Sequence, residues 1–465
     1  MDTSTGTSVN SDVVIQNVTA EGMQVQVNGE IKEIKNNLAE LKSLLQQVSA
    51  ENFKSGDKIY NIGTITNAVF SAEIGKKTFN MYLCRKLTEA LGAYNADASD
   101  FLKNMREADK GDWETQVRYT RKANRYIISG YVGVVGMLLQ KVISSGIDAF
   151  NSNNAKDYIE TCIATTTRTL QLLCFTFISK LWDHKKDNNF ESSRDSINVL
   201  DNFFNAEIEL NILDYVELLE TLVTIFDAQK ISYPFSEFNN SCLQLNSSFK
   251  KSCKNLELIK SKLDAGQIVY ATAFEAETEL TEFLSVLSFL AKYKMVSVKD
   301  ITYNIIRNGE VQYIHSYTFL GVDSDDKLFS SKFKYDSRPI CNDAVFIYKD
   351  NYLEGMNLFP FIVDVNALTN EMEVKICFYT YFEERKKKLI YSDINKIASD
   401  KNVDYKDIGD PSQVAIQFNS EVDKHLESDP DHDITLLVTD TEKFRTLQLN
   451  VVYKIFQLAY RAILE

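Results

Sequence analysis

Apolar residues recur every three or four positions through most of residues 75–294, which is the period of an amphipathic helix. The pattern is clear from Phe79 to Leu91 and again from Leu210 to Phe226. The first proline is Pro234, so polar segments must separate the helices before it. We therefore expect several long helices in this region. The expected breaks are residues 151–154, 185–189 and 233–241.

Beyond residue 295 the pattern changes from helical to strand-like. Asn308 and Gly309 lie between two runs rich in β-forming residues, 301–306 and 311–314, and Asn-Gly in that position is a strong hairpin signal. This pattern predicts a sheet of five or more strands. The further strand candidates are residues 317–322, 328–335, 344–348, 359–365 and 374–382.

The last part of the chain mixes elements. We expect a short helix at residues 391–398, a strand at residues 434–438 and a closing amphipathic helix that packs on the sheet. The apolar face expected for that last helix comprises Phe444, Leu447, Val451, Ile455, Leu458 and Ile463.

The N-terminal part has two features. Apolar residues at 13–15 and 23–27 flank Ala20-Glu21-Gly22, which predicts a hairpin. A heptad pattern then predicts a short coiled-coil helix, which either docks on the core of the chain or mediates self-association. Its apolar positions are Ile31, Ile34, Leu38, Leu41, Leu45 and Val48.

A resemblance adds to this pattern. The heptads lead into DKIYNIGTITNAVF at residues 57–70. Together, residues 31–70 resemble the leader segments that precede effector or sensor modules in bacterial conflict proteins of the anti-phage defence type. The resemblance covers no catalytic residue. It implies an adaptor or recruitment role in a defence-type system.

A chain of 465 residues exceeds the roughly 250 to 300 at which one hydrophobic core stops growing. The predicted fold class is α+β, with a long multi-helix region followed by a β-rich module that an amphipathic helix closes. The predicted domains are an N-terminal segment, a helical domain, a β-rich domain and a C-terminal α/β extension that packs on it. Their boundaries are 1–52, 53–295, 296–395 and 396–465.

Net charge and cysteine content make some classes of partner and site improbable. The net charge of -14 repels nucleic-acid phosphates, so nucleic acid is an improbable partner. The seven cysteines show no CxxC spacing, which favours reduced thiols over a zinc site. The first twelve residues lack the basic and apolar stretches of a signal peptide, and no apolar run reaches the length of a membrane helix. We therefore expect a cytoplasmic protein.

Four basic residues follow helical spacing, and we expect them to share one face that could bind an anionic partner. They are Arg118, Arg121, Lys122 and Arg125. The uncharged run 126–140 comes next and contains Gly130, Gly133 and Gly136. Each glycine costs a helix about 1 kcal/mol relative to alanine, so the run predicts a helix that needs close approach. It either packs closely in the core or, up to residue 147, meets a membrane after a conformational change.

Three other groups could carry chemistry, and each has a simpler interpretation. The acidic cluster at 429–433 contains His432 and could hold a metal, but a solvated turn at Pro430 is favoured. Asp364 with Glu373 and Lys375 resembles a metal-dependent nuclease pattern, although surface charges on a hairpin are favoured. His315 lies among tyrosines and is expected to be a strand residue rather than a base.

No nucleotide-binding, protease or kinase signature occurs, so the sequence predicts no catalytic, cofactor-binding or metal site. Phe and Tyr alternate at residues 376–382, and one face of that strand could contact a partner rather than fill the core. We expect a non-enzymatic adaptor or sensor with protein partners and possible self-association through the heptads. The alternatives are a membrane-perturbing effector and, third, a metal-dependent nuclease.

Overall fold

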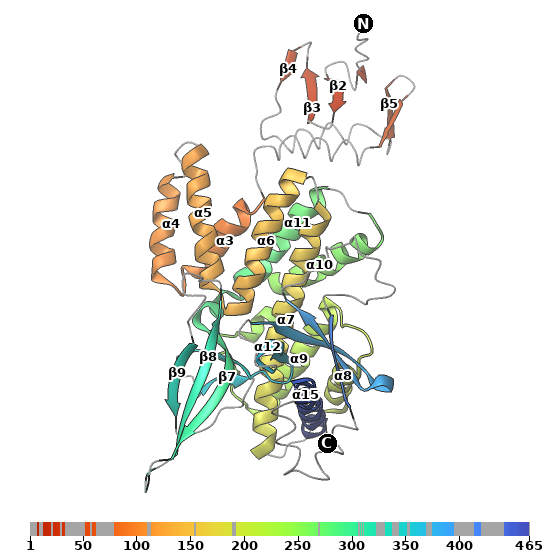
Figure 1. Ribbon diagram of the computed structural model, residues 1–465. Helices are drawn as coiled ribbons and strands as arrows, with labels where there is room; N and C mark the ends of the chain where they lie inside the picture. The colour runs from red at the N-terminus through yellow and green to blue at the C-terminus, as the bar shows by residue number, and fades with distance from the viewer. Residues whose placement is uncertain are drawn as a thin grey trace.

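The computed structural model describes most of the chain from residue 79 onward and a set of short strands before it (Figure 1). The described residues are 7–8, 13–19, 22–27, 30–32, 52–55, 58–61, 79–108, 113–152, 155–187, 192–267, 270–305, 307, 309, 311–321, 331–336, 344–350, 354–368, 374–394, 413–419 and 441–464.

The N-terminal strands form an antiparallel sheet in the order β1-β2-β3-β4 and a separate pair of β5 with β6. Their bounds are Thr7–Ser8, Val13–Thr19, Gly22–Val27, Glu30–Lys32, Asn52–Ser55 and Lys58–Asn61. Val13 lies opposite Val27, which confirms the predicted hairpin. Ile31 lies in β4, opposite Gln26, so the predicted heptad helix does not begin there, because strand pairing uses its backbone. The other heptad positions lie outside the described residues.

The middle of the chain is helical, as predicted. The helices are α3 (Met81–Leu91), α4 (Ala96–Ala108), α5 (Trp113–Gly130), α6 (Gly133–Ser152), α7 (Ala155–Asp187), α8 (Arg194–Asn205), α9 (Ile212–Gln229), α10 (Ser248–Asp264) and α11 (Tyr270–Val286), with short 3-10 turns η1 (Asn240–Leu243) and η2 (Ser288–Lys292). Side chains of Ser193, Asn211 and Ser247 cap the starts of α8, α9 and α10. Each of the three predicted polar breaks overlaps a gap between helices, although residues 151–152 still belong to α6 and residues 185–187 to α7.

Helix α7 is the centre of the packing. It contacts α6, α9, α10 and α11 and, further along, α15. Threonines are unusual in a buried helix because their hydroxyl groups need partners. In α7 the hydroxyls of Thr165, Thr166, Thr167 and Thr169 each donate to the carbonyl four residues earlier. The helix can therefore carry polar side chains through the core without leaving them unpaired.

The glycine-containing run is divided between two helices. Gly130 ends α5 and Gly133 begins α6, so the expectation of one continuous helix is wrong. A Cβ atom at Gly133 would overlap the carbonyl oxygen of Leu320, and one at Gly136 would overlap that of Ile128. These contacts support the close-packing interpretation, because only glycine lets the backbones approach so far. Among the described residues, no helix is both long and apolar enough to cross a membrane.

The C-terminal half contains two antiparallel sheets, ordered β11-β10-β7-β8-β9 and β12-β13-β14-β15 (Figure 1). The strands are β7 (Lys294–Asn304), β8 (Gln312–Leu320), β9 (Ser331–Asp336), β10 (Val345–Tyr348), β11 (Met356–Asn357), β12 (Ile362–Asp364), β13 (Ile376–Glu383), β14 (Lys388–Asp393) and β15 (Gln413–Gln417), and α12 (Val365–Leu368) follows β12. Asn304 lies opposite Gln312, which confirms the predicted Asn-Gly hairpin. Tyr391 lies in β14, so a helix does not begin there; the backbone pairing of β14 with both β13 and β15 decides the structure.

The closing helix, α15 (Thr441–Leu464), packs on β15 and also on α7 and α8. Its predicted face is only partly right. Ile463 is buried, but Val451 and Leu458 are exposed, and the buried apolar positions among the described side chains are Val452, Phe456, Ala459 and Ile463. Phe456 contacts aromatic rings from a helix and from strand β13, so helix and sheet together select the buried face.

The aromatic strand β13 does not display a contact surface. Phe378, Tyr379 and Phe382 are buried, so for these residues the expectation of an exposed face is wrong. The ring of Tyr379 lies 5.7 Å from that of Phe203 and 4.7 Å from that of Phe456. The ring of the adjacent Phe378 lies 6.3 Å from that of Phe175 on α7, so side chains from helices pack against both residues and the aromatic side chains fill the core.

The buried side chains from Phe79 to Ile463 form one continuous hydrophobic cluster. Helices α6, α7 and α8 all contact strands of the C-terminal sheets. The α+β class is therefore confirmed, with helices and sheets sharing one core. The division into domains at residues 52, 295 and 395 stays a prediction.

Candidate functional site

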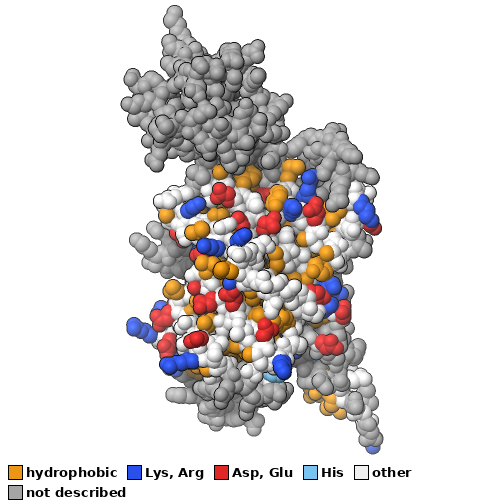
Figure 2. All heavy atoms as spheres, turned by 180° about the vertical axis from the view of Figure 1, so that it is seen from behind, with side chains coloured by type: hydrophobic (Ala, Val, Ile, Leu, Met, Phe, Trp, Pro, Cys, Tyr) orange, Lys and Arg blue, Asp and Glu red, His pale blue; other side chains and the backbone are white. Residues whose placement is uncertain are grey.

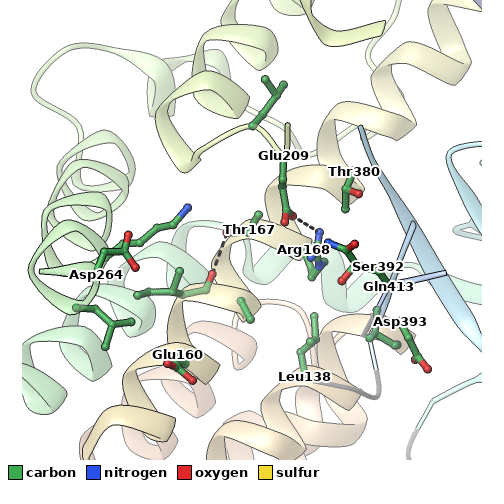
Figure 3. Close-up of a pocket in the computed structure, with 16 residues that line it drawn as sticks. Leu138, Glu160, Thr167, Arg168, Glu209, Asp264, Thr380, Ser392, Asp393 and Gln413 are labelled. Atoms are coloured by element: carbon green, nitrogen blue, oxygen red, sulfur yellow. Dashed lines mark hydrogen bonds and ion pairs between the residues drawn. The ribbon is translucent and has the colours of Figure 1, made fainter. Parts of the chain in front are cut away.

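A cavity of about 290 Å³ lies where the helices meet the second C-terminal sheet, and we call it the junction cavity (Figure 3). Its walls come from α6, α7, α10, the segment between α8 and α9, and strands β13, β14 and β15. Apolar side chains line part of it. Its charged lining residues are Glu160, Arg168, Glu209, Lys260, Asp264 and Asp393.

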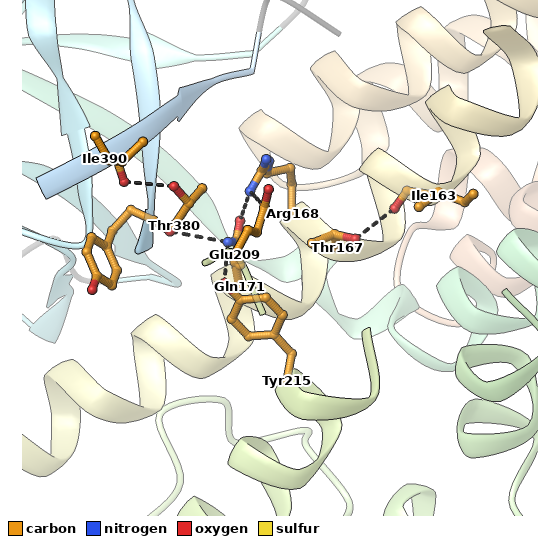
Figure 4. Close-up of polar contacts among 9 residues, drawn as sticks. Ile163, Thr167, Arg168, Gln171, Glu209, Tyr215, Thr380 and Ile390 are labelled. Atoms are coloured by element: carbon orange, nitrogen blue, oxygen red, sulfur yellow. Dashed lines mark hydrogen bonds and ion pairs between the residues drawn. The ribbon is translucent and has the colours of Figure 1, made fainter. Parts of the chain in front are cut away.

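Arg168 is a largely enclosed cation of the junction cavity. Its side chain is 11% exposed. The Nη1 atom donates to Oε1 of Glu209 at 2.7 Å and to Oε1 of Gln171 at 2.6 Å (Figure 4). A largely buried guanidinium group needs such partners, because removing its charge from water costs more free energy than a single weak contact provides. The guanidinium group is therefore held in one position.

Gln171 extends this network to the sheet. Its Nε2 atom donates to the hydroxyl of Tyr215 at 2.6 Å and to the carbonyl of Tyr379 at 3.2 Å. The register of β13 against β14 shifts between Tyr379 and Tyr381, and such a bulge interrupts the ladder of hydrogen bonds. The interruption explains how a carbonyl of a central strand can accept from a helix side chain. Arg168 is thereby connected to β13.

The carboxylates of the junction cavity come from separate elements. Glu160 lies on α7, Glu209 precedes α9, Asp264 ends α10 and Asp393 ends β14. Figure 3 shows Asp264 and Asp393 on opposite sides of the cavity. Asp393 is buried, whereas Asp264 and Glu209 are exposed at the rim.

Lys141 of α6 lies close to the part of the cavity lining that contains Asp393 and Ile394. Its Nζ atom donates to the carbonyl of Ile394, which lines the cavity. Burial lowers the pKa of Lys141 to about 8, although the negative charge of Asp393 opposes this shift. The ammonium of Lys141 is thus only weakly favoured just above neutral pH.

The predicted basic face lies elsewhere, on α5. Arg121, Lys122 and Arg125 are exposed there, while the side chain of Arg118 lies outside the described residues. Lys122 and Arg125 line a shallow depression together with Asp100 and Asn104 of α4. The acidic and amide neighbours make this a mixed surface, and its binding of an anionic partner stays a prediction.

Asp364 is not a surface charge, contrary to the favoured interpretation. It is fully buried and accepts from the Ser297 hydroxyl at 2.7 Å, the Lys299 ammonium at 2.5 Å and the Lys375 backbone N–H at 2.9 Å. Glu373 lies outside the described residues, as does the acidic cluster at 429–433. Among the described residues, no group of three His, Cys, Asp or Glu side chains could hold a metal ion. Asp364 therefore ties β7 to β12 and the start of β13.

Strands β7 and β8 run out beyond the helices as a projecting hairpin (Figure 1). We call residues 301–305 and 311–314 the β7–β8 arm. Tyr303 and Ile305 are 63% and 72% exposed, whereas Met295 and Val298 at the base of the hairpin are buried. Figure 2 shows hydrophobic side chains on this projection, which is seen there from behind. His315, just inside the arm, is buried on β8, which confirms that it is a strand residue.

Sequence reasoning missed the junction cavity, but one signal for it existed. Arg168 is the sole charged residue between Glu160 and Lys180. A single arginine in a long uncharged helix needs a partner or a ligand, because buried arginine is seldom left alone. Asp393 gave no comparable signal, since its neighbours along the chain are ordinary strand residues.

The chain was compared with known proteins at three levels. No protein-family model, curated protein or solved structure matches it. The geometry of the chain itself must therefore support any functional assignment.

Proposed function

We propose that this chain is a non-enzymatic interaction and regulatory protein that binds a protein partner through the β7–β8 arm. The observation that supports the proposal is the exposure of Tyr303 and Ile305, two large apolar side chains near the end of the arm. Tyr303 lies directly opposite Tyr313 in the antiparallel ladder, and residues two apart share a face. Ile301, Tyr303 and Tyr313 therefore lie on one side, with Thr302 and Asn304 on the other.

An apolar sheet face normally packs on a core. At the base of the same hairpin it does so, because Val296, Val298 and Tyr317, which continue the face of Tyr303 and Tyr313, are buried. Further out, Tyr303 and Ile305 are 63% and 72% exposed. Tyrosine and large aliphatic side chains that protrude on a rigid element are typical of the energetic centre of a protein interface. A partner that covers this face would bury apolar area that water now contacts.

Two observations indicate in which compartment and in which kind of system the partner should be sought. The described cysteines Cys84, Cys162, Cys174, Cys242, Cys253 and Cys377 are all free thiols, which suits a reducing compartment such as the cytoplasm. The resemblance of residues 31–70 to leader segments of bacterial conflict proteins makes a defence-type system the first place to seek the partner. The cytoplasmic location and the defence-type system are both parts of the proposal.

A site-specific crosslinking experiment tests this function. A photo-reactive amino acid replaces Tyr303 in the full chain in its native host, and a matched variant carries it at Leu245, which is 82% exposed on the helical body. We expect a defined crosslinked species from position 303 and none of that mass from position 245. A species with twice the chain's mass would identify the partner as a second copy.

A substitution makes the test specific. Ile305→Ser in the Tyr303 crosslinking variant should reduce the crosslinked species by about tenfold, since removing a central apolar side chain costs an interface on the order of 1.4 kcal/mol. Its unfolding temperature should be unchanged, because the side chain of Ile305 is exposed. Identical crosslinking at positions 303 and 245 would exclude the arm as the binding surface.

A further inference from the structure

We propose that the junction cavity binds a free α-amino acid with an apolar side chain. The carboxylate of this ligand pairs with Lys260, its ammonium pairs with Asp264, and its side chain lies against the apolar part of the lining. This inference rests on the cavity alone and does not depend on the partner proposed for the β7–β8 arm.

The charges in and beside the cavity balance. The lining carries four carboxylates and two cations, and two further lysines lie next to lining carboxylates, so four positive charges face four negative charges. A ligand for this cavity should therefore be neutral overall, because a net charge would stay unpaired in a partly enclosed site. Six of the eight charges are already engaged, as Arg168 with Glu209 at 2.7 Å, Lys156 with Glu160 at 3.7 Å, and Lys141 with the nearby Asp393.

Lys260 and Asp264 carry the two remaining charges. Within the described part of the chain, no group forms a hydrogen bond or an ion pair with either side chain, and the two are not paired with each other. Lys260 is half-buried, and Asp264 is exposed. They lie four residues apart on α10 and therefore on one face, with Cβ atoms about 6 Å apart. The cavity thus offers one ammonium and one carboxylate side by side, and a ligand that carries both charges matches them.

An α-amino acid has a suitable geometry. Its carboxylate and its ammonium are attached to the same carbon atom, so both can reach neighbouring side chains on one face of a helix. Each of these contacts is a hydrogen bond between charged groups, which is stronger than one between neutral groups. Once α10 holds both charged groups, the side chain of the ligand is the part that can extend into the cavity.

The rest of the lining suits an apolar side chain. Leu263 lies next to Asp264 on α10, and Leu138 of α6, Ile163 of α7 and Ile394 also line the cavity. Each CH₂ group that leaves water for contact with these residues raises affinity about fourfold. The same contact is unfavourable for a sugar or a nucleotide, whose hydroxyl groups would lose hydrogen bonds to water. Leucine is therefore a suitable probe.

Ligands with other charges fit less well. A dication would face the like charge of Lys260, and a dicarboxylate would face the like charge of Asp264, so each would be repelled at one end. A divalent metal ion needs several oxygen ligands that converge within about 2.6 Å of one point. Among the described residues, no group of three His, Cys, Asp or Glu side chains meets this need.

The size and the access of the cavity are also suitable. A volume of about 290 Å³ is at the lower end of the range for small-molecule sites, which favours a single amino acid over a peptide or a nucleotide. Figure 3 shows Asp264 on the α10 side of the cavity, across from Arg168 and Glu209. Because Asp264 is exposed, a ligand can reach it from solvent.

The direct test is calorimetric titration of the full chain with L-leucine. Two probes each lack one charged group: 4-methylpentanoate has no ammonium, and 3-methylbutylamine has no carboxylate. We expect leucine to bind at one site per chain and at least about tenfold more tightly than either probe, since each charged contact contributes at least that factor. Glycine should also bind at least about tenfold more weakly than leucine, because it has no side chain to bury.

Two variants locate the site. Lys260→Gln should lower the affinity for leucine about tenfold and remove the advantage of leucine over 3-methylbutylamine, because the partner of the carboxylate is lost. Asp264→Asn should lower it by a similar factor and remove the advantage over 4-methylpentanoate. Lys262→Gln is the matched control, at an exposed position on α10 outside the cavity lining, and should leave the affinity unchanged. Unfolding temperatures without ligand should be the same in all three variants.

Three results would overturn the proposal. The first is the absence of one-site binding of leucine to the full chain. The second is an equal affinity for leucine and either probe, because the two charged contacts would then contribute nothing. The third is an unchanged affinity for leucine in Lys260→Gln, which would place the ligand outside the junction cavity.

Discussion

The hydroxyl of Tyr158 on α7 donates a 2.8 Å hydrogen bond to Oε2 of Glu277 on α11, and both side chains are buried. The same carboxylate oxygen accepts from the backbone N–H of Asn80 at 2.9 Å. One acidic side chain thus joins two central helices to the residue that precedes α3. Because a buried carboxylate without donors is costly, this group should be decisive for the stability of the helical region.

The first prediction concerns that hydrogen bond. Tyr158→Phe removes the donor and leaves a buried carboxylate partly unpaired, so unfolding free energy should fall by roughly 1–3 kcal/mol. Urea denaturation at neutral pH measures it. Tyr82→Phe is the matched control, because Tyr82 donates to Glu282 at 2.9 Å in an exposed contact and its loss should cost less than about 0.5 kcal/mol. Equal losses in the two variants would contradict the central role of Glu277.

The second prediction concerns pH. Burial raises the pKa of Glu277 above its ordinary value of 4.5, and the hydrogen bonds from Asn80 and Tyr158 only partly oppose this. The folded state therefore binds this proton more tightly than the unfolded state. The resulting stability is present below pH 4.5 and is lost as the pH rises through the folded-state pKa. Glu277→Gln should consequently gain stability relative to the unmodified chain over the interval above pH 4.5, as the pH rises through the folded-state pKa of Glu277. A difference that shrinks over this interval in denaturation experiments would have the wrong sign.

The third prediction has the opposite sign. Burial tends to raise the pKa of Glu237, but hydrogen bonds from Lys349, Ser236, Tyr293 and Lys292 outweigh it and lower the pKa to about 2. This folded-state pKa lies below the ordinary value of 4.5. The stabilisation that Glu237 gives the folded state is therefore fully present above pH 4.5 and is lost as the pH falls towards 2. Glu237→Gln should therefore lose less stability than the unmodified chain between these pH values. Thermal unfolding monitored by circular dichroism across the interval is the measurement.

The fourth prediction concerns the close approach at the start of α6. In Gly133→Ala the added methyl group would overlap the carbonyl oxygen of Leu320, so α6 and the end of β8 must move apart. Overpacking of this kind costs about 1–3 kcal/mol. Gly321→Ala is the control, since no atom lies within 4 Å of the added methyl group and the effect should stay within about 0.5 kcal/mol. Similar unfolding temperatures for the two variants would disprove the close contact.

Local patterns predicted the elements well where one periodicity dominated. The apolar spacing of residues 210–226 predicted α9, and Asn308-Gly309 predicted the β7–β8 hairpin, because both depend on neighbours along the chain. The break between α5 and α6 was missed because Gly130 and Gly133 are compatible with a helix interior and with its ends. The position of Leu320 beside Gly133 is a long-range fact that no local window contains.

The candidate sites likewise divide into features that follow from neighbours along the chain and features that depend on residues far apart in the sequence. The exposure of Arg121, Lys122 and Arg125 follows from their spacing on an amphipathic helix. The burial of Asp364 does not, because its partners Ser297 and Lys299 are more than sixty residues away along the chain. The junction cavity combines residues from Leu138 to Gln413, so its charge balance cannot be read from any single segment.

By itself, the sequence determined the helical middle, the strand-rich C-terminal part and the turn between β7 and β8, because hydrophobic period and turn chemistry act over a few residues. Only the tertiary structure decided which face of α15 is buried, that the aromatic side chains of β13 fill the core, and that Asp264 and Asp393 line one cavity. These outcomes depend on which surfaces meet. That choice is made by packing between segments distant in the chain, where burial and pairing of charges outweigh local preference.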